Sequence, residues 1–131
     1  MQWTAEENAG FTTGIPWIGV NPNYTEIDAE GQESDPHSVL QFYRRLLAFR
    51  SEHPCLALGS FDSVPSENPS LLSYRRSLPE ESLLVLLNLS SEHIAFRPEF
   101  WPAHEHLLGN YLGHRPDHLR PWEARIASLK M

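Results

Sequence analysis

The stretch from Asp35 to His53 constrains the fold most, because it has the pattern of a single amphipathic helix. Asp35 is placed to cap the first free N–H groups, and Pro36 suits the first helical position. Pro54 is expected to end the helix, because the residue before a proline is pushed out of the helical region. One helix cannot cover its apolar stripe alone, so the residues on either side must supply packing partners. That stripe recurs at three- and four-residue spacings through Val39, Leu40, Phe42, Tyr43, Leu46, Leu47 and Phe49.

Residues 1–34 precede this helix and show neither helical nor strand periodicity. They contain four glycines and two prolines among aromatic residues such as Trp3, Phe11 and Trp17. The segment is too aromatic for a disordered tail, and an irregular segment of this length is unusual within a compact small domain. We interpret it as an irregular N-terminal arm shaped to lie on a larger body. The alternative is an arm that folds back over its own helix.

Short strand patterns follow the helix, within residues 55–131. Leu83–Leu89 includes a continuous apolar run of strand length, which predicts a central strand buried on both faces. Shorter patterns are expected at 59–64, 71–76, 93–97, 105–112 and 122–129, with a turn or bulge at Gly109-Asn110. Strands at intervals of roughly ten residues are typical of an antiparallel β-sandwich. The predicted class is therefore mainly β with one long helix.

Length and cysteine usage limit the class of protein. A chain of 131 residues with 40% apolar content is one domain, or one domain with an attached arm. Cys55 is the single cysteine, so an internal disulfide is excluded and a reducing, cytoplasmic location is expected. The start of the chain has no basic residue and no apolar run, so no secretory signal is expected. No apolar run is long enough to span a bilayer, and no membrane partner is expected.

The net charge of −7 is concentrated at one end of the chain. Residues 1–35 hold seven acids and neither Lys nor Arg, whereas residues 36–131 hold ten acids and ten bases. Phosphate binding needs clustered cations, so this charge pattern argues against nucleic acid as a partner.

Catalytic chemistry is not evident in the sequence. A glycosidase needs two carboxyl groups that flank the scissile bond. The strand segments offer acids only in turn-like positions, such as Glu80-Glu81 and Asp117. The adjacent pair Glu6-Glu7 is expected to be solvated. We therefore assign no catalytic residue to this chain.

Metal and cofactor sites are also not expected. His104-x-His106 would place two rings on one face of a strand, with His114 and His118 nearby, but no Cys or tight acid cluster completes a ligand set. We interpret these histidines as surface residues in turns. Cys55 is expected to be a small packed residue, because no local signature supports a Cys-His-Asn nucleophile. The glycines of the arm do not have the spacing of a phosphate-binding loop.

The aromatic residues of the arm allow two interpretations. They could stack on sugar rings, or they could be buried against a protein surface. Their spacing favours burial.

Several sequence motifs are distinctive, among them Met1-Gln2-Trp3, the run from Asn8 to Gly14 and the run from Leu119 to Ala124. These motifs resemble the late segment of the α-amylase superfamily α-glucosidases. The similarity is closest to the oligo-1,6-glucosidase, dextran glucosidase and trehalose-6-phosphate hydrolase group of glycoside hydrolase family 13. It covers most of the chain and is strongest in residues 1–59. Thr4 departs from the pattern, because these enzymes usually carry an acid there, and little of 98–118 can be matched. The matching residues are Met1-Gln2-Trp3, Asn8 to Gly14, Pro16-Trp17, Val20 to Tyr24, Ile27, Asp35-Pro36, Ser38, Phe42-Tyr43-Arg44, Leu46, Arg50, Glu52-His53-Pro54, Gly59, Leu87 to Ser90 and Leu119 to Ala124.

The resemblance implies a place for each segment. Residues 1–54 would be a remnant of the (β/α)8 barrel, comprising the loop after strand 8 and the last barrel helix. Residues 55–131 would be the C-terminal β-sandwich domain. Loops that follow barrel strands lie on the catalytic face. The nucleophile, general acid and second carboxylate of the family would all precede the segment that matches Met1, so none is carried onto this chain.

Two hypotheses of function follow. The first is a C-terminal fragment of an α-glucosidase, with a structural role and no activity of its own, whose parent hydrolyses α-glucosidic bonds in oligosaccharides. Its partner would be the catalytic barrel of the parent, in cis or in trans. The alternative is a free-standing carbohydrate-binding or interaction β-sandwich module. Neither hypothesis requires a cofactor or a metal.

Overall fold

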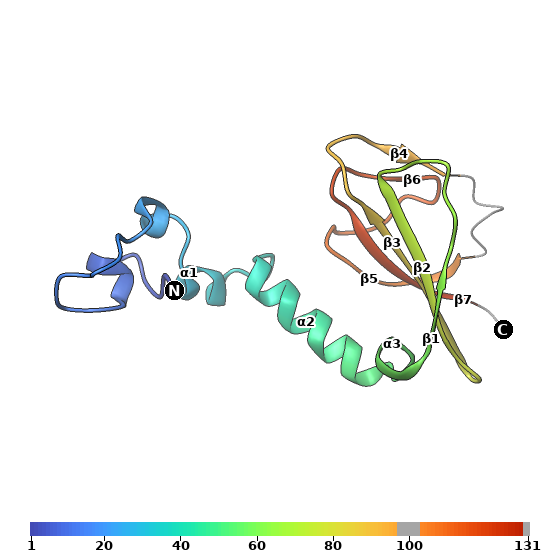
Figure 1. The fold of residues 1–131 in the computed structure, drawn as a ribbon, viewed down its shortest axis with the longest axis horizontal. Helices are drawn as coiled ribbons and strands as arrows, with labels where there is room; N and C mark the ends of the chain where they lie inside the picture. The colour runs from blue at the N-terminus through green and yellow to red at the C-terminus, as the bar shows by residue number, and fades with distance from the viewer. Residues whose placement is uncertain (97–102, 130–131) are drawn as a thin grey trace. The chain divides into compact units, whose positions relative to one another are not determined.

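A computed structural model of the chain describes residues 1–96 and 103–129. Arg97, the expected end of one strand, lies outside the described residues. The chain divides into two compact units, Met1–Ala48 and Phe49–Met131 (Figure 1). Each unit is described by itself below. No helix among the described residues is long and apolar enough to cross a membrane.

The N-terminal unit consists of short helical turns joined by irregular backbone. These are the 3-10 helices η1 (Glu7–Gly10) and η2 (Pro22–Thr25), the helix α1 (Ala29–Ser34) and the start of α2 (Val39–Glu52). The beginning of the chain runs alongside α1, because the Ala29 N–H donates to the Gln2 carbonyl at 2.9 Å. The Gln2 amide also donates to the Ile27 carbonyl at 2.6 Å. The segment 1–34 is therefore mostly irregular but internally bonded.

The expected start of the long helix is wrong by a few residues. α2 begins at Val39, and Asp35 instead follows the end of α1. The Asp35 carboxylate accepts from the His37 N–H at 2.8 Å, which closes a local turn. Ser38 takes the capping role, because its hydroxyl accepts from the Gln41 N–H at 3.2 Å. Asp35 and Ser38 both carry a side-chain acceptor, so the sequence allows either as the cap. The turn closed by Asp35 delays the helix, and Ser38 becomes the residue just before it.

None of the residues of α2 is buried. Val39, Tyr43 and Leu47 recur at four-residue intervals and are exposed. They lie on one face of the helix because four residues make about one turn. This face is an apolar surface that the described residues leave open.

The second unit is built on an antiparallel sheet, which confirms the expectation of a mainly β chain (Figure 1). Five strands pair in the order β1-β2-β3-β7-β5, and two very short strands, β4 and β6, pair separately. A short helix, α3 (Cys55–Leu58), precedes the sheet. The strand bounds are β1 Ser60–Ser63, β2 Leu71–Leu78, β3 Glu81–Asn88, β4 Ile94–Ala95, β5 Ala103–Gly109, β6 His118–Leu119 and β7 Ala124–Leu129.

The apolar run of β3 forms the centre of this sheet, as its sequence predicts. All four residues from Leu83 to Leu86 are buried. Leu84 and Leu86 join a core cluster that includes Ile94 of β4 and Leu119 of β6. The core therefore lies between β3 and the short β4–β6 pair.

The last expected strand is shorter than predicted. β7 begins at Ala124, and the two residues before it form part of a turn. Trp122 has a φ of +56°, in the left-handed region. A residue in that conformation cannot continue a strand.

Candidate functional site

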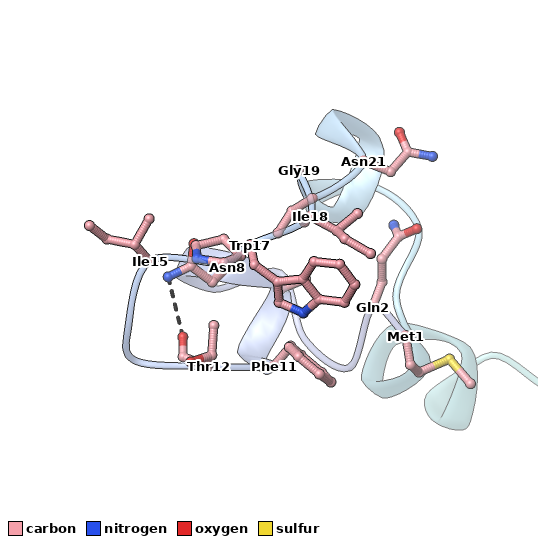
Figure 2. A pocket seen from close by; sticks show the side chains of 13 residues that line it. Met1, Gln2, Asn8, Phe11, Thr12, Ile15, Trp17, Ile18, Gly19 and Asn21 are labelled. Atoms are coloured by element: carbon pink, nitrogen blue, oxygen red, sulfur yellow. Dashed lines mark hydrogen bonds between the residues drawn. The ribbon is translucent and has the colours of Figure 1, made fainter.

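The N-terminal unit contains a hollow of about 460 Å³ (Figure 2). The indole of Trp17 is 91% exposed and contributes to its lining together with the ring of Phe11. Its polar side chains are the amides of Gln2, Asn8 and Asn21 and the hydroxyl of Thr12. No acidic or basic side chain lines it, so the hollow offers apolar contact and neutral hydrogen bonds rather than charge.

Consecutive left-handed residues shape the loop beside this hollow. Asn8, Ala9 and Gly10 have φ values of +55°, +56° and +64°. A Cβ on Gly10 would lie 2.5 Å from the Thr4 hydroxyl oxygen, so only glycine fits there without a rearrangement. The Trp3 N–H donates to the Ala9 carbonyl at 2.9 Å, and the Asn8 amide donates to the Thr12 carbonyl at 3.2 Å. These bonds hold the loop in its tight conformation.

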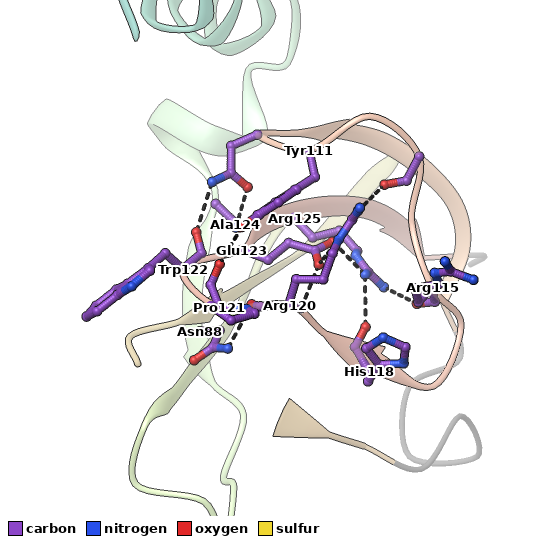
Figure 3. A network of polar contacts seen from close by, with 12 residues as sticks. Asn88, Tyr111, Arg115, His118, Arg120, Pro121, Trp122, Glu123, Ala124 and Arg125 are labelled. Carbon is purple, nitrogen blue, oxygen red and sulfur yellow. Dashed lines mark hydrogen bonds and ion pairs between the residues drawn. The ribbon is translucent and has the colours of Figure 1, made fainter. Parts of the chain in front are cut away.

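Glu123 is the only acid that is fully buried among the described residues, with 2% of its surface exposed. Its carboxylate lies between two arginines (Figure 3). Oε2 accepts from the Arg120 backbone N–H at 2.8 Å and from Arg120 Nε at 3.1 Å, and Oε1 accepts from Arg125 Nη2 at 2.7 Å. Burial by itself raises the pKa of Glu123, but the hydrogen bonds from Arg120 and Arg125 outweigh it and hold the pKa below its ordinary value.

The arginines extend this network into the chain around them. Arg125 donates to the Arg115 carbonyl at 2.7 Å and to the His118 carbonyl at 3.2 Å, and Arg120 donates to the Gly113 carbonyl. The Glu123 carboxylate thus fixes the segment between β5 and β7. Each of the two Glu123 carboxylate oxygens accepts a hydrogen bond from an arginine, so the acid forms a structural ion pair. It is not placed to donate or accept a proton in catalysis.

Glu81 is the acid of a second cluster, at the start of β3. Its carboxylate bonds to the His53 ring and accepts from the Cys55 N–H at 3.2 Å. Burial raises the pKa of Glu81, yet its hydrogen bonds to His53 and Cys55 bring the pKa below the ordinary value. Burial and the neighbouring carboxylate raise the pKa of the Cys55 thiol to about 12. The thiol is therefore protonated at neutral pH and fully buried, which confirms Cys55 as a packed residue and argues against a nucleophile.

The histidines lie in more sheltered positions than expected. The rings of His106 and His114 stack with their centroids 4.9 Å apart. Burial lowers the pKa of His106. His106 belongs to β5 and His118 to β6, and both are half-buried, so for them the prediction of surface residues in turns is wrong. His114 is exposed in a loop, as predicted. The structure does not describe the side chain of His104, and the described residues contain no group of three or more metal-ligating side chains.

The burial of Glu123 was not foreseen in the sequence. Its signal is the pattern Arg120-x-x-Glu123-x-Arg125, in which two cations flank one acid at the start of an apolar strand. Alternation along a strand shows which residues share a face but does not show which of them is covered. Arg120 and Arg125 lie against the Glu123 carboxylate, and Arg120 is itself bonded to the Gly113 carbonyl.

Comparison with known proteins shows which family the chain is similar to. The family model "Alpha amylase, catalytic domain" matches residues 1–59. The oligo-1,6-glucosidase of Parageobacillus thermoglucosidasius is 38% identical over 100% of this chain and 25% of its own length. The isomaltulose synthase of Klebsiella sp. LX3 superposes with a TM-score of 0.91 at 30% identity, over 98% of this chain and 24% of its own. The chain is similar to enzymes of glycoside hydrolase family 13.

The trehalulose synthase of Pseudomonas mesoacidophila MX-45 shows the same relation, with a TM-score of 0.90 and 39% identity over 98% of this chain. The chain spans about a quarter of the length of the relatives that it matches. The hollow lies within the segment that matches the catalytic domain, whereas the Glu123 network lies outside it.

Proposed function

We propose that the chain forms the C-terminal part of a family 13 α-glucosidase and has a structural role there. In this proposal residues 1–54 are the loop after the eighth barrel strand and the last barrel helix. Residues 55–131 are a C-terminal antiparallel β-sandwich. The parent enzyme would hydrolyse α-glucosidic bonds in oligosaccharides, and its catalytic barrel would be the partner of this chain, in cis or in trans.

One observation carries this proposal: the segment that matches a catalytic domain leaves its apolar side chains exposed. Trp17 of the arm and Val39 and Tyr43 of α2 all lie within residues 1–59 and are exposed. Large exposed apolar patches are rare on monomeric proteins and mark interaction surfaces. The second unit, in contrast, buries its own core around β3. One unit with exposed apolar side chains and a second unit with a core of its own are what the end of a larger barrel enzyme would present.

The acids of the described residues support a role without catalysis. Glu123 is enclosed by two arginines, and Glu81 is bound by His53 and the backbone of Cys55. Each carboxylate has a structural partner of its own. In a glycosidase the two acids face each other across the bond that is cleaved. In this proposal the catalytic carboxylates belong to the portion of the parent that precedes the match to Met1.

The hollow favours a second candidate function, a carbohydrate-binding module. Its exposed Trp17 and Phe11 rings lie close to neutral amide groups, which suit the apolar faces and hydroxyl groups of a sugar. This candidate predicts saturable binding of isomaltose to the chain alone. Replacement of the indole, Trp17→Ala, would then abolish the binding. A structural segment of a barrel predicts no such binding by the isolated chain.

Hydrolysis assays of the purified chain test the absence of catalysis. We expect no turnover of p-nitrophenyl α-glucoside, isomaltose or trehalose 6-phosphate above that of a heat-killed control. Turnover that disappears when a single acid of this chain is replaced by its amide would place an active site within the 131 residues and would overturn the proposal.

A further inference from the structure

Trp122 is the one non-glycine residue with left-handed backbone among the described residues of the second unit. Its φ of +56° lies in the left-handed region, which glycine and asparagine adopt readily and bulky residues rarely do. Its indole is 61% exposed, so the side chain is not held in place by a core. Backbone strain of this kind is often found at functional positions.

Several hydrogen bonds on both sides of Trp122 impose this conformation. The Trp122 N–H donates to the Ser90 carbonyl at 3.0 Å, and the Trp122 carbonyl accepts from the Asn110 amide at 2.9 Å. The preceding carbonyl, of Pro121, accepts from the Tyr111 hydroxyl at 2.9 Å. The next residue is the buried Glu123. The turn is therefore rigid, and Figure 3 shows the indole pointing away from the network that holds it.

The folding of this unit accounts for the turn but not for the tryptophan. A glycine or an asparagine would make the same backbone bonds with less strain. The exposed indole gains little from burial within the unit. A rigidly presented tryptophan is a common anchor in binding interfaces, because it loses little entropy when it is covered.

The surroundings of Trp122 favour an apolar protein surface over a sugar. A sugar platform needs free hydrogen-bonding groups beside the ring. The Asn88 amide donates to the Glu92 and Arg120 carbonyls, and the Asn110 side chain bonds to the backbone of Trp122 and Ala124. These two amides are thus engaged within the unit.

An exposed leucine lies on the neighbouring segment. Leu89 immediately precedes Ser90, the residue whose carbonyl accepts from the Trp122 N–H, and it is exposed. Leu89 and Trp122 are therefore two exposed apolar residues at this corner of the sheet.

We propose that Trp122, with Leu89 beside it, anchors the sheet to an apolar surface of the catalytic domain. This inference rests on the proposed function. The occupant follows from the comparisons, since residues 1–59 match part of a catalytic domain and the relatives are about four times as long as this chain. The anchor would dock on the portion of that domain for which this chain has no counterpart.

The test compares one substitution in two contexts. The first is the chain alone, and the second is a chimera in which this chain replaces the matching quarter of the Parageobacillus oligo-1,6-glucosidase. Trp122→Asn keeps a residue that adopts the left-handed conformation. We expect its melting temperature in the isolated chain to equal or exceed that of the unsubstituted chain. In the chimera we expect a lower melting temperature, because the anchor is lost. Leu112→Asn, at another exposed leucine, is the matched control and should change neither value.

Four results would overturn the anchor. Equal shifts in both contexts would show that Trp122 acts only within its own unit. An active chimera whose melting temperature does not respond to Trp122→Asn would contradict the anchor and leave the proposed function intact. Saturable quenching of the fluorescence of the isolated chain by isomaltose, lost in Trp122→Asn, would identify a sugar platform instead. A chimera that neither folds nor hydrolyses α-glucosides would contradict the proposed function and the anchor with it.

Discussion

At the scale of single residues, Glu123 shows how a charge can be buried without forming a reactive site. Its two carboxylate oxygens are shared between Arg120 and Arg125, and removal of one partner leaves a buried charge uncompensated. Replacement of one member of such a pair typically costs about 3–5 kcal/mol. We expect Glu123→Gln to reduce the free energy of unfolding by an amount of this order. Glu80→Gln, at an exposed acid, should leave the denaturant midpoint unchanged.

The same carboxylate predicts a pH dependence. Because the folded-state pKa of Glu123 is below its unfolded value, its contribution to stability is complete above the ordinary carboxyl pKa. That contribution is lost as the pH falls from the ordinary value through the depressed one. Glu123→Gln should therefore flatten the acid side of the stability curve, as measured by urea unfolding at a series of pH values. An acid limb of unchanged slope in the variant would show that other groups dominate.

Leu86 tests the core at the same scale. Its side chain is buried in the cluster around β3, together with Leu84 and Ile94. Leu86→Ala should cost roughly 2–5 kcal/mol through lost burial and an unfilled cavity. Leu72→Ala, at an exposed position on the adjacent strand β2, is the control and should cost less. A melting temperature for Leu86→Ala that matches the unsubstituted chain would contradict the core described here.

At the scale of elements, the structure shows which of two residues, Asp35 or Ser38, caps the start of α2. The sequence alone did not distinguish them. The Ser38 hydroxyl accepts from the Gln41 N–H and donates to the Gln32 carbonyl at 2.7 Å. Asp35 closes only the turn before it. We expect Ser38→Ala to cost about 0.5–2 kcal/mol and to speed hydrogen exchange at the first amides of α2. Asp35→Ala should have the smaller effect on those amides, and the reverse order would restore Asp35 as the cap.

The strength of each sequence pattern determined which elements could be predicted. The apolar run Leu83–Leu87 is continuous, so the position of β3 at the centre of the sheet was predictable. β4 and β6 have two residues each and exist because they pair with each other across more than twenty residues. No local pattern specifies such a pairing. The end of the last strand was predictable, but its start at Ala124 depends on the turn at Trp122.

The candidate sites, like β4 and β6, depend on contacts between residues that are separated in the sequence. The hollow depends on the left-handed run from Asn8 to Gly10, and a sequence shows left-handed backbone only where glycine suggests it. The buried state of Glu123 depends on arginines held by carbonyls several residues away. Both sites arise from tertiary contacts. The resemblance to family 13 was recognisable because several complete sequence motifs match, such as the run from Asn8 to Gly14.

At the scale of the whole molecule, the two units differ in how they use their apolar residues. The second unit closes around a core between β3 and the β4–β6 pair. The first unit is held together by hydrogen bonds of its backbone and amide side chains. It leaves the aromatic rings of Phe11 and Trp17 exposed, and also the face of α2 that carries Val39 and Tyr43. A segment of a larger catalytic domain accounts for both patterns. The central claim is that this chain completes such a domain without contributing its chemistry.

The most direct measurement compares hydrolysis of p-nitrophenyl α-glucoside by three samples at equal concentration. These are the chain alone, the Parageobacillus oligo-1,6-glucosidase without the quarter that matches this chain, and the chimera that joins the two. We predict turnover by the chimera alone, with its melting temperature above that of the shortened relative. Turnover by the shortened relative equal to that of the chimera would contradict a structural role for this chain. Turnover by the chain alone would contradict its lack of catalytic residues.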